Sequence, residues 1–322
     1  MTMKAKILVT LAALLCVAAA VVENEIGLPE ARLTIRAVDE QNQPLSGVSI
    51  MLAFVDKLHP RNPQIVTGET DGNGFFTGQG ATEGILGGRI TKPGYYDGGA
   101  PIPHFYQAKD GHWQPWDQTY TTILRPIGNA VAQYAKTGWF EIPSISQPCG
   151  YDLDKGDWVA PYGRGVVADF VFTLQRQYVG LQDFDVKVEL AFSQPLDGIQ
   201  DARMPEIGRY SAFKWQREAP VTGFKPKLTL HFAHKSDVYE ETATDAQNYF
   251  FRVRTVEQNG RIIAANYGKI KGGLFLAPSH SQTCKVQLTY YLNPTPLDRN
   301  MEFDLTQNLF KNLKDEEKPR DP

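Results

Sequence analysis

The first half of the chain alternates apolar and polar residues in short runs that turn residues separate. Two such runs span residues 33–38 and 48–55, and the segment Asp71-Gly72-Asn73-Gly74 follows them. Alternation with a period of two indicates half-buried β-strands, and glycine and asparagine tolerate the positive φ that a tight reversal needs. We therefore expect antiparallel strands here, with further strands at residues 85–90 and 120–124.

The second half carries the same pattern more clearly. Residues 184–192 alternate five apolar residues with polar or small ones, which predicts a strand with one buried and one wet face. Asp197-Gly198 and Asn259-Gly260 are two-residue hairpin signals, the second between runs 249–256 and 262–267. Residues 127–136 suit a short helix or a linker. Further strands are expected at residues 166–174, 227–234, 274–276 and 285–292. Together they would complete a sandwich or barrel of about seven or eight strands.

These patterns predict an all-β protein made of two β-sandwich-like domains. The 28 glycines, the 21 prolines and an aromatic content of 11% suit many short strands joined by tight turns. The expected organisation is a signal peptide at 1–20, a first domain at 21–135, a second at 136–308 and a solvated charged tail at 309–322.

Turn and core residues of the first domain occur in a characteristic order and spacing: Asp39, Pro44, Leu45, Gly47, Val48, Thr70, Asp71, Gly74, Phe75, Lys92, Gly94 and Tyr95. This pattern resembles the carboxypeptidase regulatory-like domain. The resemblance covers roughly residues 33–124 and implies a small transthyretin-like β-sandwich, usually an accessory module of exported bacterial proteins. It implies no catalytic residue. Residues 290–304 also resemble a closing segment of exported bacterial proteins that carry this module without an assigned activity.

The amino terminus has the three parts of a secretory signal peptide. Lys4 and Lys6 precede an apolar run at 7–17, and Ala18-Ala19-Ala20 supplies a small-residue cleavage site. The run is too short for a bilayer span, which needs about 20 apolar residues. We expect cleavage before Val21 and a secreted, periplasmic or envelope-associated protein without a transmembrane segment. Loss of two lysines changes the net charge from −3 to −5, and no basic patch indicates nucleic-acid binding.

Two cysteines remain after signal cleavage, Cys149 and Cys284. Export to an oxidising compartment favours a disulfide between them. The alternative is a pair of buried free thiols.

Asp152, Asp154 and Asp157 surround Gly156 in a short acidic turn. Calcium needs six to eight oxygen ligands, and alternating aspartates can direct several carboxylates to one point. Calcium is therefore the one candidate cofactor. The spacing departs from the EF-hand loop, because the twelfth position is Gly163, so a solvated acidic turn is the alternative.

His231 and His234 form an HxxH pair, which suggests zinc at first sight. On a strand, two residues three positions apart point to opposite faces, so the two rings should diverge. A zinc ion needs ligands that converge on one point. We expect no zinc site here.

A long aromatic segment lies between Tyr95 and Tyr120, interrupted by glycines and prolines. Tyr106, Trp113, Trp116 and Tyr120 can form a stacking surface for sugar rings, because flat aromatic faces bury C–H groups at low entropic cost. The alternative is a loop that folds back between the two domains, with the tryptophans as core.

The sequence therefore predicts an exported, non-catalytic binding or structural protein, with extracellular or envelope polysaccharide as the expected partner. No G-x-S-x-G elbow is present, and the glycine-rich stretch 78–88 lacks the lysine of a phosphate loop. No catalytic residue is nominated. The alternative is a secreted polysaccharide hydrolase, because paired carboxylates for glycoside hydrolysis leave no fixed sequence spacing.

Overall fold

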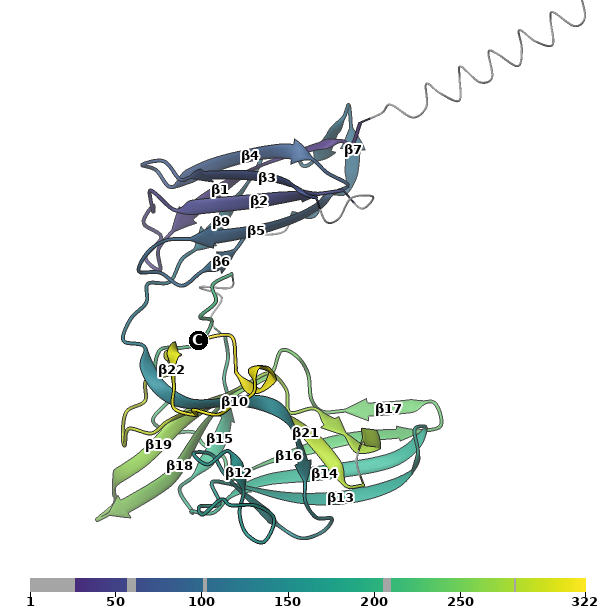
Figure 1. Ribbon diagram of the computed structural model, residues 1–322, viewed down its shortest axis with the longest axis vertical. Coiled ribbons are helices and arrows are strands. Elements are labelled where there is room, and N and C mark those ends of the chain that lie inside the picture. Colours follow the sequence, from purple (N-terminus) through teal and green to yellow (C-terminus); the bar gives the residue numbers. More distant parts are fainter. Residues whose placement is uncertain (1–26, 57–61, 101–102, 205–209, 281) are drawn as a thin grey trace, which may run out of the picture. The chain divides into compact units, whose positions relative to one another are not determined.

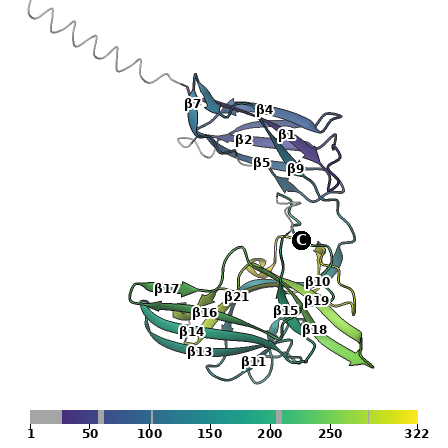
Figure 2. The ribbon, with the colours of Figure 1, turned by 180° about the vertical axis from the view of Figure 1, so that it is seen from behind.

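The computed structural model describes residues 27–56, 62–100, 103–204, 210–280 and 282–322. The chain divides into two compact units, Met1–Pro126 and Ile127–Pro322, and both are built from β-strands (Figures 1 and 2). The all-β prediction is confirmed. The boundary lies before the expected one at residue 135, which would have cut strand β10 (Val131–Ile142). The expected signal peptide lies outside the described residues.

The first unit packs two sheets against one core. Strand β1 (Glu30–Val38) alternates half-buried and buried residues along most of its length, so one side is committed to the interior. Its Leu33 and Ile35 meet Ile50 and Leu52 of β2 in one apolar cluster. One sheet contains β1 with β4 (Phe75–Ala81), β7 (Gln107–Lys109), β8 (His112–Gln114) and β9 (Gln118–Ile123), and the other contains β2 (Ser49–Val55), β3 (Gln64–Glu69), β5 (Ile85–Thr91) and β6 (Gly98–Gly99).

The predicted reversal at residues 71–74 connects β3 to β4. The Asp71 Oδ1 accepts hydrogen bonds from the backbone N–H groups of Asn73 at 2.9 Å and Phe75 at 2.8 Å. Gly74 has a φ of 82°, and a Cβ there would lie 2.5 Å from the Ala37 carbonyl oxygen. Only glycine satisfies both constraints.

Within the aromatic segment between Tyr95 and Tyr120, strands β7 and β8 form a hairpin, where the sequence suggested an irregular loop. Gln107 pairs with Gln114 and Lys109 with His112, and the turn between the strands is Asp110-Gly111. Both turn residues have positive φ, 51° and 78°, as a type I′ hairpin turn requires. Strand β9 then runs parallel to β1.

The second unit also packs two sheets against one core. Most of the strands expected there are present, but the strand expected at 166–174 begins at Phe170, and of residues 274–276 only Leu276 lies in a strand. Strand β14 buries every second residue over most of its length, as predicted. No helix forms at 127–136: residues 127–130 are irregular, as a linker would be, and β10 begins at Val131. The first sheet contains β11 (Cys149–Asp152), β12 (Asp157–Trp158), β13 (Phe170–Gly180), β14 (Asp183–Phe192), β16 (Lys227–Lys235) and β17 (Val238–Glu241). The second contains β10 with β15 (Gly198–Asp201), β18 (Asn248–Gln258), β19 (Arg261–Lys271), β20 (Leu276–Ala277), β21 (Cys284–Asn293) and β22 (Phe303–Asn308), and a 3₁₀ turn η1 (Pro278–His280) precedes β21.

The two expected hairpin turns have different outcomes. Asn259-Gly260 joins β18 to β19, with φ values of 54° and 73°, and this prediction is confirmed. Asp197-Gly198 is not a hairpin turn, because β15 begins at Gly198 and pairs with β18. Asp197 has another use, which is described below.

The carboxyl-terminal segment, expected to be a solvated charged tail, keeps many of its side chains exposed and also contacts the second unit. It contains a 3₁₀ turn, η2 (Asp315–Glu317). The Tyr291 hydroxyl donates to the Asp321 carbonyl oxygen at 3.0 Å, and the Lys136 ammonium lies 3.4 Å from the Glu317 carboxylate. The segment is charged, and both a charged side chain and its backbone contact strands β10 and β21.

Among the described residues, no helix has the length and apolar character that crossing a bilayer requires.

Candidate functional site

The most concentrated polar network of the second unit is built around Arg254. Strands β18 and β19 change register between Val253 and Val256, and Arg254 there has a φ of 57°. This conformation costs a non-glycine residue about 1–2 kcal/mol. The Asp197 carboxylate offsets that cost by accepting the backbone N–H groups of Arg254 at 3.0 Å and Thr255 at 2.9 Å. Asp197 therefore holds the irregular backbone that directs the arginine.

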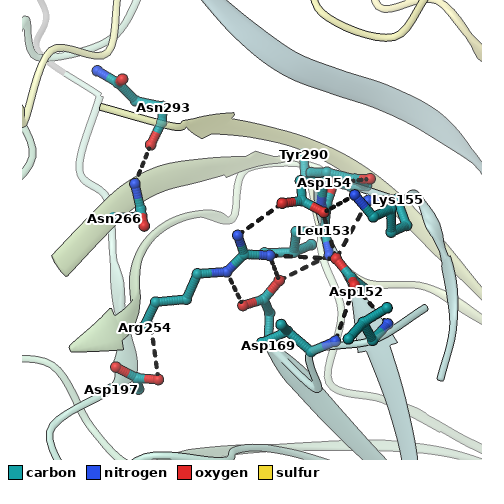
Figure 3. A network of polar contacts seen from close by, with 12 residues as sticks. Asp152, Leu153, Asp154, Lys155, Asp169, Asp197, Arg254, Asn266, Tyr290 and Asn293 are labelled. Atoms are coloured by element: carbon teal, nitrogen blue, oxygen red, sulfur yellow. Dashed lines mark hydrogen bonds and ion pairs between the residues drawn. The ribbon is translucent and has the colours of Figure 1, made fainter. Parts of the chain in front are cut away.

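Three carboxylates meet the Arg254 guanidinium (Figure 3). Nε and Nη2 each donate to Asp169 at 2.8 Å, in a bidentate pair. Nη1 donates to Asp154 at 2.8 Å, and Nη2 also reaches Asp152 at 3.3 Å. The hydrogen bonds that Arg254 donates to Asp169 are the main reason that the pKa of Arg254 is raised, so this arginine stays charged.

Asp152 is fully buried, yet it is held as a carboxylate. Burial by itself would raise its pKa, but hydrogen bonds outweigh burial and the pKa is lowered. Its Oδ2 accepts the backbone N–H groups of Val166 at 2.8 Å and Val167 at 3.0 Å. The Tyr290 hydroxyl donates to the Leu153 carbonyl oxygen at 2.8 Å and fixes the same turn from the opposite sheet. The network therefore braces the two sheets against each other.

The acidic turn meets a cation of the protein itself. Asp152 and Asp154 are brought together around Arg254, whereas Asp157 accepts the backbone N–H groups of Trp158 at 2.9 Å and Arg164 at 3.0 Å. Within the described part of the chain, no group of three or more His, Cys, Asp or Glu side chains is arranged to hold a metal ion. Calcium binding by these three aspartates stays a prediction.

Cys149 and Cys284 are both free thiols in the structure, so the predicted disulfide is not present. Each is completely buried, Cys149 on β11 and Cys284 on β21, on opposite sheets of the same core. Burial raises the pKa of both thiols, that of Cys284 to about 11. They therefore resemble apolar core side chains more than reactive groups.

The two histidines of the HxxH pair diverge, as predicted from strand phase. His231 Nε2 lies 3.1 Å from Asp185 Oδ1, while His234 Nδ1 lies 3.0 Å from the Leu181 carbonyl oxygen. The His234 ring also packs against Phe184. The two rings share no ligand position.

The four aromatic residues nominated from the sequence divide into two groups. Trp113 packs against the core of the first unit, and its Nε1–H donates to the Thr82 carbonyl oxygen at 2.8 Å. Tyr120 also packs against that core. In contrast, the Tyr106 side chain is 72% exposed, and the Trp116 ring lies 4.3 Å from the His112 ring in an edge-on contact. Trp113 and Tyr120 are therefore anchors, and Trp116 and Tyr106 remain available for contacts.

A fully buried lysine, Lys269, was not predicted. Its side chain is inaccessible, its ammonium donates to the Met301 carbonyl oxygen at 2.6 Å, and the Phe213, Trp215 and Tyr291 rings surround it at 4.5–5.4 Å. Burial lowers its pKa well below the usual value. No sequence signal marks this lysine or Arg254 as different from the other basic residues.

Comparisons with known proteins do not assign this chain to a family. No family model matches it, and no curated protein matches it. Solved structures that resemble parts of the chain include a 3-chlorocatechol 1,2-dioxygenase from Rhodococcus opacus, with a TM-score of 0.25 and 14% identity over 32% of this chain and 62% of that one. They also include a streptococcal ancillary pilin, with a TM-score of 0.21 and 12% identity over 66% of this chain and 62% of that one.

A proposed carbohydrate-binding protein from Bacteroides uniformis has a TM-score of 0.19 and 12% identity over 84% of this chain and 99% of that one. The matched part of this chain spans about three fifths of the length of the dioxygenase and of the pilin. The resemblance of the first unit to the carboxypeptidase regulatory-like domain stays a resemblance.

Proposed function

We propose that the protein is an exported, non-catalytic polysaccharide-binding protein, and that the β7–β8 hairpin carries a contact surface. The observation that supports this proposal is the division of the hairpin into two faces. One face anchors the hairpin on the first unit through Trp113. The other face presents polar side chains beside an aromatic ring.

Strand alternation produces this division. Because neighbouring residues point to opposite faces, His112 and Gln114 point away from the side that Trp113 occupies. Gln107 and Lys109 pair with Gln114 and His112, and both are exposed. The outer face of the hairpin thus offers amide, ammonium and imidazole groups that can hydrogen-bond to sugar hydroxyls.

Trp116 supplies the aromatic component of this surface. Its ring is half-buried against His112, which restrains its orientation before any ligand arrives. A restrained aromatic ring loses little conformational entropy when a sugar stacks on it. Stacking of this kind contributes about 1.4 kcal/mol, a factor of ten in Kd, so one site binds weakly and repeated ligand units or several sites are needed for retention.

Affinity electrophoresis of the full chain in gels that contain individual polysaccharides tests the proposal. Trp116→Ala is expected to weaken binding to the retained polysaccharide about tenfold without a large change in melting temperature. Trp113→Ala is expected to lower the melting temperature clearly, because that ring fills space against Gly84 and the core.

Tyr239→Ala is the matched control, since Tyr239 is 60% exposed and lies on β17 of the second unit. It should leave retention unchanged. Unaltered binding by Trp116→Ala would remove the hairpin as a contact surface. Release of reducing sugar by the purified protein, with loss of release on changing a single carboxylate, would favour the hydrolase alternative instead.

A further inference from the structure

Strand β10 presents an exposed tryptophan on the outer face of the seven-stranded sheet. Tyr134, Phe140 and Ile142 of this strand belong to the core of the second unit or pack against it. Alternate residues point the other way, and among them Trp139 is 49% exposed. This tryptophan was not singled out from the sequence.

The partner strand continues a row of polar side chains beside Trp139. In the register of β10 with β21, Trp139 faces Gln287 and Thr137 faces Thr289. The two threonine hydroxyl oxygens lie 2.5 Å apart. Thr137 is two residues from Trp139, so the paired hydroxyls lie about 7 Å along the sheet from the tryptophan. Two residues along in the other direction, Glu141 faces Lys285 on the same side of the sheet. The outer face therefore combines one aromatic ring with uncharged hydrogen-bonding groups and one pair of opposite charges.

The carboxyl-terminal segment forms a wall at one side of this face, where its yellow ribbon lies near β10 in Figure 1. A surface hollow lies between this segment and the sheet, and Trp139 stands beside it, outside its lining. Its floor includes Thr137, Gln287, Thr289 and Tyr291, and its charged lining is formed by Lys271, Asp315, Glu316, Lys318, Arg320 and Asp321.

The charges of this lining balance. Three are acidic and three are basic, and two pairs are already formed, Lys271 with Asp321 and Lys318 with Asp315 at 2.8 Å. A lining of this kind gives no net attraction to an anionic or a cationic polymer. A neutral ligand rich in hydroxyl groups can instead hydrogen-bond to both kinds of charged group without displacing a counter-ion.

We propose that the outer face of β10 and β21 is a second binding site, and that it takes a neutral oligosaccharide. One sugar ring stacks on Trp139, and its neighbour reaches Gln287 and the Thr137–Thr289 hydroxyl pair. The strands β10 and β21 are paired with each other along this face, so it offers side chains and not strand backbone, which disfavours an extended peptide. This inference deepens the proposed function, because it adds a site on the second unit to the hairpin site on the first.

Titration of the full chain with neutral gluco-, manno- and xylo-oligosaccharides, followed by calorimetry, tests the second site. For the neutral oligosaccharide that binds, Trp139→Ala is expected to raise the Kd about tenfold. Gln287→Ala should raise it several-fold. Tyr239→Ala serves as the control for loss of an exposed aromatic ring elsewhere on the same unit, and melting temperatures confirm that each variant is folded.

The outcomes separate this inference from the proposed function. If Trp116→Ala weakens binding and Trp139→Ala does not, the hairpin proposal stands and the second site is wrong. If only Trp139→Ala weakens binding, the second site stands and the hairpin is not a contact surface. Binding restricted to acidic oligosaccharides such as oligogalacturonate, or no binding of any neutral oligosaccharide, would overturn the second site.

Discussion

Replacing Arg254 with methionine should destabilise the second unit by about 3 kcal/mol. Methionine retains much of the volume but leaves Asp169, which is inaccessible to solvent, without its two charge-assisted hydrogen bonds. Breaking a buried ion pair on one side costs about 3–5 kcal/mol. The Arg254 side chain is 27% exposed, so solvent reduces the loss and the lower end of that range is expected.

Cysteine reactivity measures this loss in the unit concerned. The chain has three cysteines, and the two that follow the expected signal peptide, Cys149 and Cys284, are buried in the core of the second unit. Their alkylation as a function of urea therefore reports the unfolding of that unit without a contribution from the first. Arg261→Met is a matched control, because Arg261 begins β19 in an exposed position and should cost less than about 0.5 kcal/mol.

The pH dependence of the variant provides an independent check. Burial already raises the pKa of Asp169, while the Arg254 hydrogen bonds and charge oppose the rise; without the guanidinium, the pKa in the folded variant lies further above its unfolded value. A carboxyl group of this kind favours the folded state below its unfolded pKa, and that contribution is lost as the pH rises through the folded pKa. The deficit of Arg254→Met should therefore shrink toward pH 4. A loss below about 1 kcal/mol at pH 7, or a deficit that does not change with pH, would refute the idea that Arg254 neutralises buried carboxylates.

Three further predictions concern the same unit. Cys149 and Cys284 should resist alkylation in the folded protein and react in urea without prior reduction, whereas peptide mapping that finds them cross-linked would restore the disulfide. Burial raises the pKa of Tyr249 to about 12, so stability should fall as the pH rises from about 10 through that value, and Tyr249→Phe should flatten this fall in urea titrations. If calcium binds the acidic turn, millimolar calcium should raise the melting temperature and Asp154→Ala should abolish the rise; no shift in the wild type would end that hypothesis.

Most of the strands could be predicted because their signal is local. The alternation of residues 184–192 and the Asn259-Gly260 turn each depend on a few neighbouring residues, and both appear in the structure. The aromatic hairpin had an equally local signal in Asp110-Gly111, but the surrounding prolines and glycines suggested a loop. The Asp-Gly turn signal was a better guide to the hairpin than the number of prolines and glycines around it.

The polar brace could not be predicted, because its parts are far apart in the sequence. Asp169 lies 85 residues from Arg254, and Asp152 lies 102 residues from it. The sequence left calcium and a solvated acidic turn as alternatives for the aspartates of the turn, and in the structure two of them, Asp152 and Asp154, contact Arg254. It suggested a metal ion because a distant arginine leaves no mark near them. The same reason explains why Asp197 was interpreted as a hairpin residue, since the backbone that it supports lies on another strand.

The tryptophans show most directly what register adds to sequence. Trp113 and Trp139 both lie on strands beside polar residues, yet one anchors a hairpin on its core and the other is half exposed on an open sheet face. Strand residues alternate faces, so a shift of one position would exchange these roles. Strand pairing decides which residues face the core and which face the surface. For Trp113 the relevant pairing is that of His112 with Lys109, and for Trp139 it is its own pairing with Gln287. A search for aromatic contact surfaces in β-proteins therefore has to begin from strand pairing, because the density of aromatic residues along the chain selected Trp113 and passed over Trp139.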